Sequence, residues 1–91
     1  MPSLVNRRLF ITGMGSGIGL ATARLAVAEG ALVSGTIQTT EQQASLDGVI
    51  PADCCYRLDV TDEAALGAAV TEAADRFGGL EGVVACAGMI K

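Results

Sequence analysis

The chain contains no histidine and no tryptophan, and only 3% of its 91 residues are aromatic. Without histidine, the adjacent Cys54 and Cys55 and the distant Cys86 have neither the partners nor the spacing of a zinc site. An odd number of cysteines without regular spacing does not form a disulfide framework either. The sequence therefore predicts reduced thiols and no metal site.

Basic residues and long apolar runs are also scarce. Six basic against ten acidic residues give a net charge of -4, with no basic cluster beyond Arg7-Arg8, which argues against nucleic-acid binding. No run approaches the ~20 apolar residues of a membrane span. Arg7-Arg8 precedes an apolar stretch, as in twin-arginine export signals, but four glycines and Arg24 interrupt it and no cleavage site follows. We expect a cytoplasmic protein that binds neither nucleic acid nor membranes.

The 51% of hydrophobic residues, mostly small and aliphatic, predict one folded domain over residues 1–91. Continuous apolar runs alternate with segments of helical periodicity, which is typical of a parallel sheet with helices on both faces. Right-handed crossovers give the strand order 3-2-1-4. The predicted class is therefore α/β, a Rossmann-like doubly wound parallel sheet of about four strands, truncated relative to larger members. Strands are expected at 8–12, 31–37, 54–60 and 80–88, and helices at 17–29, briefly after Thr40, and from about 62 to 77.

The periodicity also predicts which helix faces are buried. The first helix has one apolar face at Ile18, Ala21, Thr22, Leu25 and Ala28, while its opposite side, at Leu20, Ala23 and Val27, is apolar too. Most of its circumference is therefore expected to be covered. Thr61 or Asp62 should cap the last helix and Gly78-Gly79 should end it, and its apolar face comprises Leu66, Ala69, Val70, Ala73 and Phe77.

Glycines stand at every second position from Gly13 to Gly19, between the first strand and the first helix. A strand that turns directly into a helix points the unpaired N–H groups of that helix at the strand end, where they suit a pyrophosphate. We expect Gly13 to let the chain leave the strand sharply, Gly17 to let the backbone approach a phosphate, and Gly19 to let the helix pack closely on the sheet. The alternative is a glycine-rich turn without a ligand. The fingerprint G-x-G-x-x-G is absent, because Leu20 stands where its last glycine belongs.

The pattern that is present, T-G-x-x-x-G-x-G from Thr12 to Gly19, resembles the short-chain dehydrogenase/reductase family. Two further stretches carry the resemblance: LDVTD at 58–62, and ACAG at 85–88, where the family usually shows N-N-A-G. The resemblance covers essentially the whole chain and implies a dinucleotide site. The implied cofactor-binding residues are Gly13, Ser16, Gly17, Ile18, Gly19, Ile37, Gln38, Asp59, Val60, Ala87 and Gly88.

Two of these motifs leave alternatives open. The resemblance implies that Asp59 binds the adenine amino group and that the Val60 backbone holds the adenine ring, but Asp59 is equally explained as a cap or turn residue. Ala85 and Cys86 replace both asparagines of the family pattern, so two amides near the nicotinamide side are lost. Cys86 is interpreted as a small buried residue, with a redox thiol as the alternative.

The cofactor is expected to be NAD(H) rather than NADP(H). The acid that selects NAD usually ends the second strand, and a basic residue there or beside the glycines favours NADP. Here that position is Ile37, followed by Gln38, and Met14, Gly15 and Ser16 supply no cation. Gln38 is expected to hydrogen-bond a ribose hydroxyl.

The family resemblance implies that the catalytic serine, the Tyr-x-x-x-Lys pair and an asparagine all follow the fourth strand, whereas this sequence ends at Lys91. Its one tyrosine, Tyr56, falls inside the third strand with Val60 four places on, so no catalytic residue is predicted. The fourth strand would have an open edge, which predicts a homo-oligomer. Three functions remain: an NADH-dependent oxidoreductase that passes hydride to a quinone or dye (diaphorase-like), a non-catalytic dinucleotide-binding module, or a fragment of a larger reductase.

Overall fold

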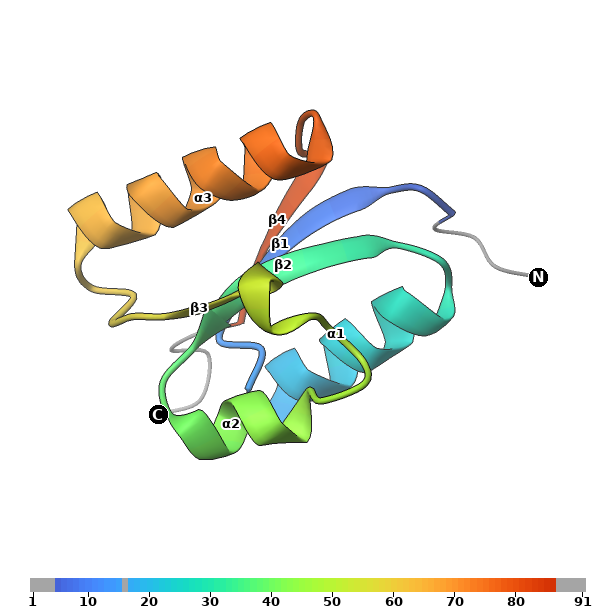
Figure 1. Ribbon diagram of the computed structural model, residues 1–91, viewed down its shortest axis with the longest axis horizontal. Helices are drawn as coiled ribbons and strands as arrows, with labels where there is room; N and C mark the ends of the chain where they lie inside the picture. Colours follow the sequence, from blue (N-terminus) through green and yellow to red (C-terminus); the bar gives the residue numbers. More distant parts are fainter. Residues whose placement is uncertain (1–4, 16, 87–91) are drawn as a thin grey trace.

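The computed structural model describes residues 5–15 and 17–86, which form a parallel sheet flanked by helices (Figure 1). The strand order is β3-β2-β1-β4, with every neighbouring pair parallel. This arrangement confirms the predicted fold class and strand order. The strands are β1 (Arg8–Thr12), β2 (Leu32–Ile37), β3 (Cys55–Arg57) and β4 (Gly82–Ala85); the helices are α1 (Gly17–Ala28), α2 (Thr40–Ser45), the 3-10 turn η1 (Ala52–Cys54) and α3 (Glu63–Phe77).

Helices cover the two faces of the sheet, with α3 on one side and α1 and α2 on the other (Figure 1). Alternate residues of β1 point to these two layers. Phe10 is fully buried against Ala69 and Ala73 of α3. Ile11 is fully buried in the second cluster, with Ala23 of α1. The continuous apolar run of β1 is therefore needed to fill both cores.

The α1 helix buries the face opposite to the one expected from its larger residues. Its buried residues are Gly19, Ala23 and Ala26, whereas Ile18 is 50% exposed and Leu25 is 64% exposed. The expectation that most of the circumference of α1 is covered was therefore wrong: the side with Ile18 and Leu25 is exposed, and the opposite side, with Ala23, is buried. The buried side carries the smallest residues of α1, and at its first turn an added Cβ on Gly19 would collide with the Gly13 carbonyl oxygen, so a larger residue does not fit there. Because α1 is apolar on both sides, periodicity alone could not distinguish them.

The α3 helix agrees with its prediction. Ala69 and Ala73 are buried, and the remaining three members of the predicted face are partly buried. The Asp62 carboxylate accepts a hydrogen bond from the backbone N–H of Ala65 at 3.1 Å, which is the expected N-cap. Gly78 ends the helix in the left-handed conformation, with φ 79°.

Three strands are shorter than predicted. The β2 strand starts one residue late, and β3 and β4 are shorter where polar side chains bond to the chain near them. The predicted strand 54–60 is β3, only Cys55–Arg57, since Cys54 belongs to η1 and Asp59 folds back onto Thr61. The predicted strand 80–88 is β4, Gly82–Ala85 among the described residues. Its start is set by Glu81, whose side chain accepts a hydrogen bond from the Arg8 backbone N–H and is occupied with β1.

Candidate functional site

The turn between β1 and α1 is held in place by β2. Thr36 is the anchor: its hydroxyl accepts from the Gly13 N–H at 2.8 Å, and its carbonyl accepts from the Met14 N–H at 2.9 Å. The Met14 side chain is fully buried in the core. Gly13 has φ 71°, a conformation that side-chain-bearing residues rarely adopt, so the chain does leave β1 at a glycine-dependent bend.

Gly17 and Gly19 are glycines for different reasons. A Cβ added at Gly19 would collide with the carbonyl oxygen of Gly13, so Gly19 permits α1 to pack on the turn itself rather than on the sheet. A Cβ added at Gly17 would meet nothing within 4 Å, and Gly17 has φ 58°. The backbone at the start of α1 therefore faces open space. That space, beside N–H groups at the positive end of a helix, fits an anionic group such as a diphosphate.

The ends of neighbouring strands lie beside this turn, since all four strands are parallel (Figure 1). Gln38, directly after β2, and Asp59, after β3, line one hollow of about 380 Å³ together with Arg57 and Leu58. At the other neighbour of β1, the Cys86 N–H donates to the Thr12 hydroxyl at 3.2 Å. The structure thus brings Gln38 and Asp59 together. Ser16, Ala87 and Gly88 lie outside the described residues.

Ile37 and Gln38 differ sharply in exposure. The Ile37 side chain is 1% exposed and belongs to the core, so only its backbone can border the hollow. Gln38 is exposed and is the first side chain after β2 that can reach a ligand there. Val60 is half-buried in the turn after Asp59, and Ile18 is exposed in the first turn of α1.

The Asp59 carboxylate is a turn acceptor. Its Oδ1 accepts from both the backbone N–H of Thr61, at 2.9 Å, and the hydroxyl of Thr61, at 2.7 Å. These bonds lower the pKa of Asp59 below its ordinary value, so the group is ionised at neutral pH. Asp59 therefore acts as a turn residue through Oδ1. That it also binds the adenine amino group remains a prediction.

Two residues beside Gln38 were missed by reading the sequence. Arg57 faces Ile37 across the β2–β3 register, and its guanidinium donates to the Thr40 hydroxyl at 3.0 Å. The Gln42 side chain lies over Gly15 and accepts a hydrogen bond from the Gln38 N–H at 2.7 Å. Counting along one strand could not find Arg57, although the predicted parallel register of the second and third strands would have pointed to it.

Cys54 and Cys55 lack the low pKa of reactive thiols. Cys54, Cys55 and Cys86 are all free. Burial raises the pKa of Cys55 to about 11, with a further contribution from Cys54 and Asp53, and burial also raises the pKa of Cys54. Among residues 5–15 and 17–86, no three His, Cys, Asp or Glu side chains gather where they could hold a metal ion.

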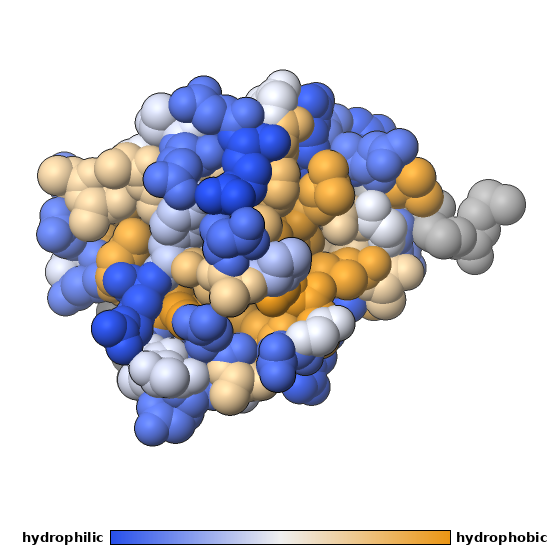
Figure 2. All heavy atoms as spheres, viewed as in Figure 1, coloured by the Kyte–Doolittle hydropathy of each residue, from blue (hydrophilic) through white to orange (hydrophobic). Residues whose placement is uncertain are grey.

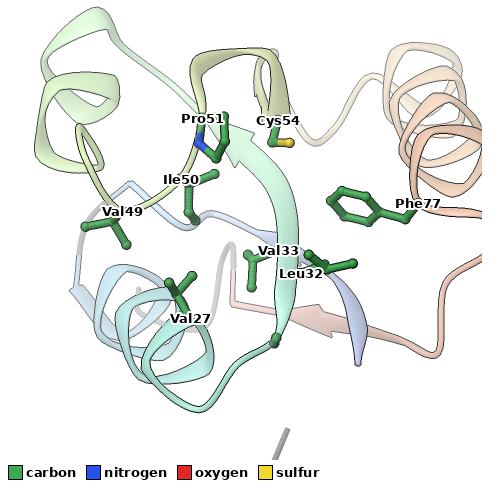
Figure 3. A pocket seen from close by; sticks show the side chains of 9 residues that line it. Val27, Leu32, Val33, Val49, Ile50, Pro51, Cys54 and Phe77 are labelled. Carbon is green, nitrogen blue, oxygen red and sulfur yellow. The ribbon is translucent and has the colours of Figure 1, made fainter. Parts of the chain in front are cut away.

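A second hollow, of about 210 Å³, lies near the opposite end of β2 and is lined almost entirely by apolar side chains. Figure 3 shows Val33 and Leu32 on opposite sides of β2, with Val27 reaching in from α1 and Phe77 from α3. Figure 2 shows apolar atoms gathered on this face between the helix layers. Because it lies away from Gly17 and Gln38, this hollow is not part of the glycine-turn site. None of the helices in the described part of the chain has the length and apolar character to cross a membrane.

A family model described as enoyl-(acyl carrier protein) reductase matches residues 13–91. The chain also superposes on a short-chain type dehydrogenase/reductase from Mycobacterium ulcerans with a TM-score of 0.84 and 30% identity, covering 98% of this chain and 35% of that one. The chain belongs to the short-chain dehydrogenase/reductase family. This confirms the resemblance carried by the glycine pattern.

Curated relatives of this short-chain dehydrogenase/reductase chain include several named enzymes. A sorbitol dehydrogenase from Cereibacter sphaeroides is 38% identical over 79 residues, covering 86% of this chain and 31% of its own length. The 3-oxoacyl-[acyl-carrier-protein] reductase MabA from Mycobacterium avium is 36% identical over 90 residues, covering 99% of this chain and 32% of its own. The chain therefore spans about a third of the length of the relatives it matches.

Two further solved structures contain a dinucleotide. One is a short-chain dehydrogenase from Burkholderia cenocepacia in complex with NADP, with a TM-score of 0.76, 31% identity, and coverage of 88% of this chain and 35% of that one. The other is a 3-ketoacyl-(acyl-carrier-protein) reductase from Brucella melitensis complexed with NADH, with a TM-score of 0.75, 27% identity, and coverage of 89% and 34%. Structurally similar family members thus hold either nicotinamide cofactor.

Proposed function

We propose that this chain binds a nicotinamide dinucleotide at the glycine turn, and that it binds NAD(H) more tightly than NADP(H). The observation that carries the proposal is the open space at Gly17, where a left-handed backbone begins α1 and an added side chain would meet nothing. The fold that this chain shares with NADP- and NADH-bound proteins supports it.

Each group of residues in the proposed site suits a different part of the dinucleotide. Backbone N–H groups of the turn suit the diphosphate. The Gln38 amide can hydrogen-bond ribose hydroxyls, and Asp59 with the Val60 backbone suits the adenine ring and its amino group. The proposed set is Gly13, Ser16, Gly17, Ile18 and Gly19 for the diphosphate, Ile37 (by its backbone) and Gln38 for the adenosine ribose, Asp59 and Val60 for adenine, and Ala87 and Gly88 for the second ribose.

For activity, we propose a diaphorase-like oxidoreductase that passes hydride from NADH to a quinone or dye. The bound nicotinamide supplies the hydride chemistry, and the chain supplies binding and orientation. Hydride addition to a quinone gives a hydroquinone anion, which takes its proton from water, so no proton donor among the described residues is required. Tyr56 is not proposed as a proton donor to the substrate, because its hydroxyl already donates to Glu72 at 3.1 Å. Burial, followed by Glu72, also raises the pKa of Tyr56.

A second candidate is a non-catalytic dinucleotide-binding module or a piece of a larger reductase. It is favoured by the coverage of only about a third of each relative. We also propose a cytoplasmic location, consistent with free thiols, and a homo-oligomer formed through β4. In the described chain β4 pairs with β1 alone, and Val83 on it is 56% exposed.

The experiment compares Gly17→Ala with Gly48→Ala. Both glycines have left-handed backbones and empty surroundings, with φ 58° and 77°, so the two substitutions cost similar strain. Only Gly17 lies in the proposed site. NADH binding, followed by its fluorescence, should weaken at least tenfold in Gly17→Ala and stay within twofold of wild type in Gly48→Ala.

Turnover is measured in the same samples as loss of NADH absorbance with a panel of quinones and tetrazolium dyes. Turnover that disappears in Gly17→Ala supports the oxidoreductase. Binding without turnover supports the module, and absence of both in the wild-type chain overturns the proposed function.

A further inference from the structure

The side chain of Gln42 occupies the space between the glycine turn and the end of β2. An added Cβ on Gly15 would lie 2.7 Å from Gln42 Cδ, so the amide lies directly on the turn. On its other side, Gln42 Oε1 accepts the Gln38 N–H at 2.7 Å. The amide therefore uses the backbone donor that lies closest to the proposed ribose position.

The start of α2 fixes Gln42 in this place. Thr39 is the N-cap, and its hydroxyl accepts from the Gln42 N–H at 3.2 Å. The sequence Thr39-x-x-Gln42 matches a capping box, except that the glutamine reaches back to Gln38 rather than to Thr39 itself. The Thr39 cap thus holds the Gln42 backbone at the start of α2, and the Gln42 side chain covers Gly15.

Arg57 lies on the other side of Gln38. It lines the same hollow as Gln38 and Asp59, and it donates to the neutral hydroxyl of Thr40. The ion pairs of the described residues involve other arginines. Arg57 therefore has no carboxylate within ion-pair distance in the described part of the chain, although Asp59 lines the same hollow. An arginine with a backbone N–H is a favourable donor pair for a phosphate group.

We propose that Gln42 determines which 2′ substituent of the adenosine ribose this site accepts. This inference rests on the proposed dinucleotide function. With Gln42 in place, the Gln38 N–H is already used and the amide fills the space over Gly15, so the site takes a ribose hydroxyl. Without it, the Gln38 N–H and the Arg57 guanidinium become two donors for a 2′-phosphate. In this account NAD(H) is favoured because the Gln38 N–H is already bonded to Gln42, and not because a cation is absent next to the glycines.

The test measures dissociation constants for NADH and NADPH by fluorescence titration of the intact chain. Gln42→Ala should improve NADPH binding relative to NADH at least tenfold over wild type. Adding Arg57→Ala to Gln42→Ala should remove that gain. Gln43→Ala, on the same short helix, and Arg7→Ala, a cation at the opposite end of β1, should leave the ratio within twofold of wild type.

Each other result has a meaning. An unchanged ratio in Gln42→Ala, with both ligands bound, overturns the inference and leaves the proposed function standing. A gain that persists without Arg57 overturns its assignment as the phosphate partner. If neither wild type nor any variant binds a dinucleotide, the proposed function fails and the inference fails with it. If Gln42→Ala binds a dinucleotide and wild type does not, the proposed function of the wild-type chain fails, and the inference fails with it, because Gln42 then excludes both ligands rather than selecting between them.

A second variant keeps the test valid should Gln42→Ala lose α2, which circular dichroism would report. Gln42→Glu retains the shape and the acceptor for the Gln38 N–H but adds a negative charge. It should weaken NADPH binding at least fivefold and leave NADH binding within twofold. Equal effects on both ligands would overturn the inference.

Discussion

Individual glycines of the β1–α1 turn have different physical roles, although the sequence presents them as one repeat. Gly13 provides a positive φ, Gly17 provides open space, Gly15 accommodates Gln42, and Gly19 accommodates a carbonyl oxygen. Within the described part of the turn, open space for a ligand is found at Gly17. The other three glycines allow the close contacts and the bend that shape the turn.

For a single residue of this turn, we predict that Gly19→Ala destabilises the fold without a direct effect on the ligand space. The added methyl group collides with the backbone oxygen of Gly13, which cannot rotate away as a side chain would. We expect a loss of about 2–3 kcal/mol in the free energy of unfolding, measured by urea denaturation. The control is Gly67→Ala, exposed on α3 with nothing within 4 Å, which should gain about 0.5–1 kcal/mol. Equal stabilities of the two variants would contradict this packing of α1.

Among the contacts between elements, Glu81 joins the start of β4 to β1. Its carboxylate accepts from the Arg8 guanidinium at 3.1 Å, the Arg7 guanidinium at 3.0 Å and the Arg8 backbone N–H at 2.9 Å. These bonds lower the pKa of Glu81, with the Arg8 side chain as the largest cause and Arg7 next. A carboxyl whose pKa is lower in the folded state stabilises the fold above its unfolded pKa, and that contribution is lost as pH falls through the folded value.

We therefore predict that Glu81→Gln lowers the melting temperature at pH 7. The difference from wild type should shrink as pH falls below about 4.3, the ordinary pKa of a glutamate, because the wild-type carboxyl is then progressively protonated. Thermal unfolding at several pH values checks this. Asp75→Asn, which removes an exposed carboxylate from α3, is the control and should not change the melting temperature at pH 7. A Glu81→Gln difference that is constant from pH 7 to pH 3 would refute the assignment.

The order of elements was predictable from the sequence, whereas several of their contacts were not. Continuous apolar strands alternating with helices were enough for the 3-2-1-4 sheet. The buried face of α1 was not predictable, because Ile18 and Leu25 on one side and Ala23 and Ala26 on the other are all apolar. The early end of β3 and the late start of β4 coincide with hydrogen bonds of Asp59 and Glu81, which periodicity does not report.

The candidate site, too, was predictable from the sequence only in part. The glycine turn and the strand ends follow from the residue pattern, so the sequence is enough to single out Gly17, Gln38 and Asp59. It is not enough for Arg57 and Gln42. Arg57 reaches the hollow from the neighbouring strand, where it pairs with Ile37, and Gln42 reaches Gln38 from the next helix. The proposed cofactor preference depends on where Arg57 and Gln42 lie in the fold, so it could not be predicted by counting along the sequence.

For the molecule as a whole, we predict a homodimer that pairs β4 of one copy with β4 of another. A two-fold axis through this edge makes the two strands antiparallel and extends the sheet. Val83→Lys should give a monomer in light scattering at micromolar concentration, where wild type gives twice the mass of the 9.2 kDa chain. Leu25→Lys, at a 64% exposed position on α1, should leave the dimer intact. A monodisperse wild-type monomer would rule the dimer out.

Whether the open turn at Gly17 seats a dinucleotide decides the proposed function. It is measured most directly by an NMR titration of the chain with NADH that follows the backbone amide signal of each residue. We expect the shifts to concentrate at Gly13, Gly17, Gly19, Gln38 and Asp59. Dinucleotide binding at the turn would be refuted by shifts confined to the apolar hollow at the other end of β2, or by no shifts at millimolar NADH.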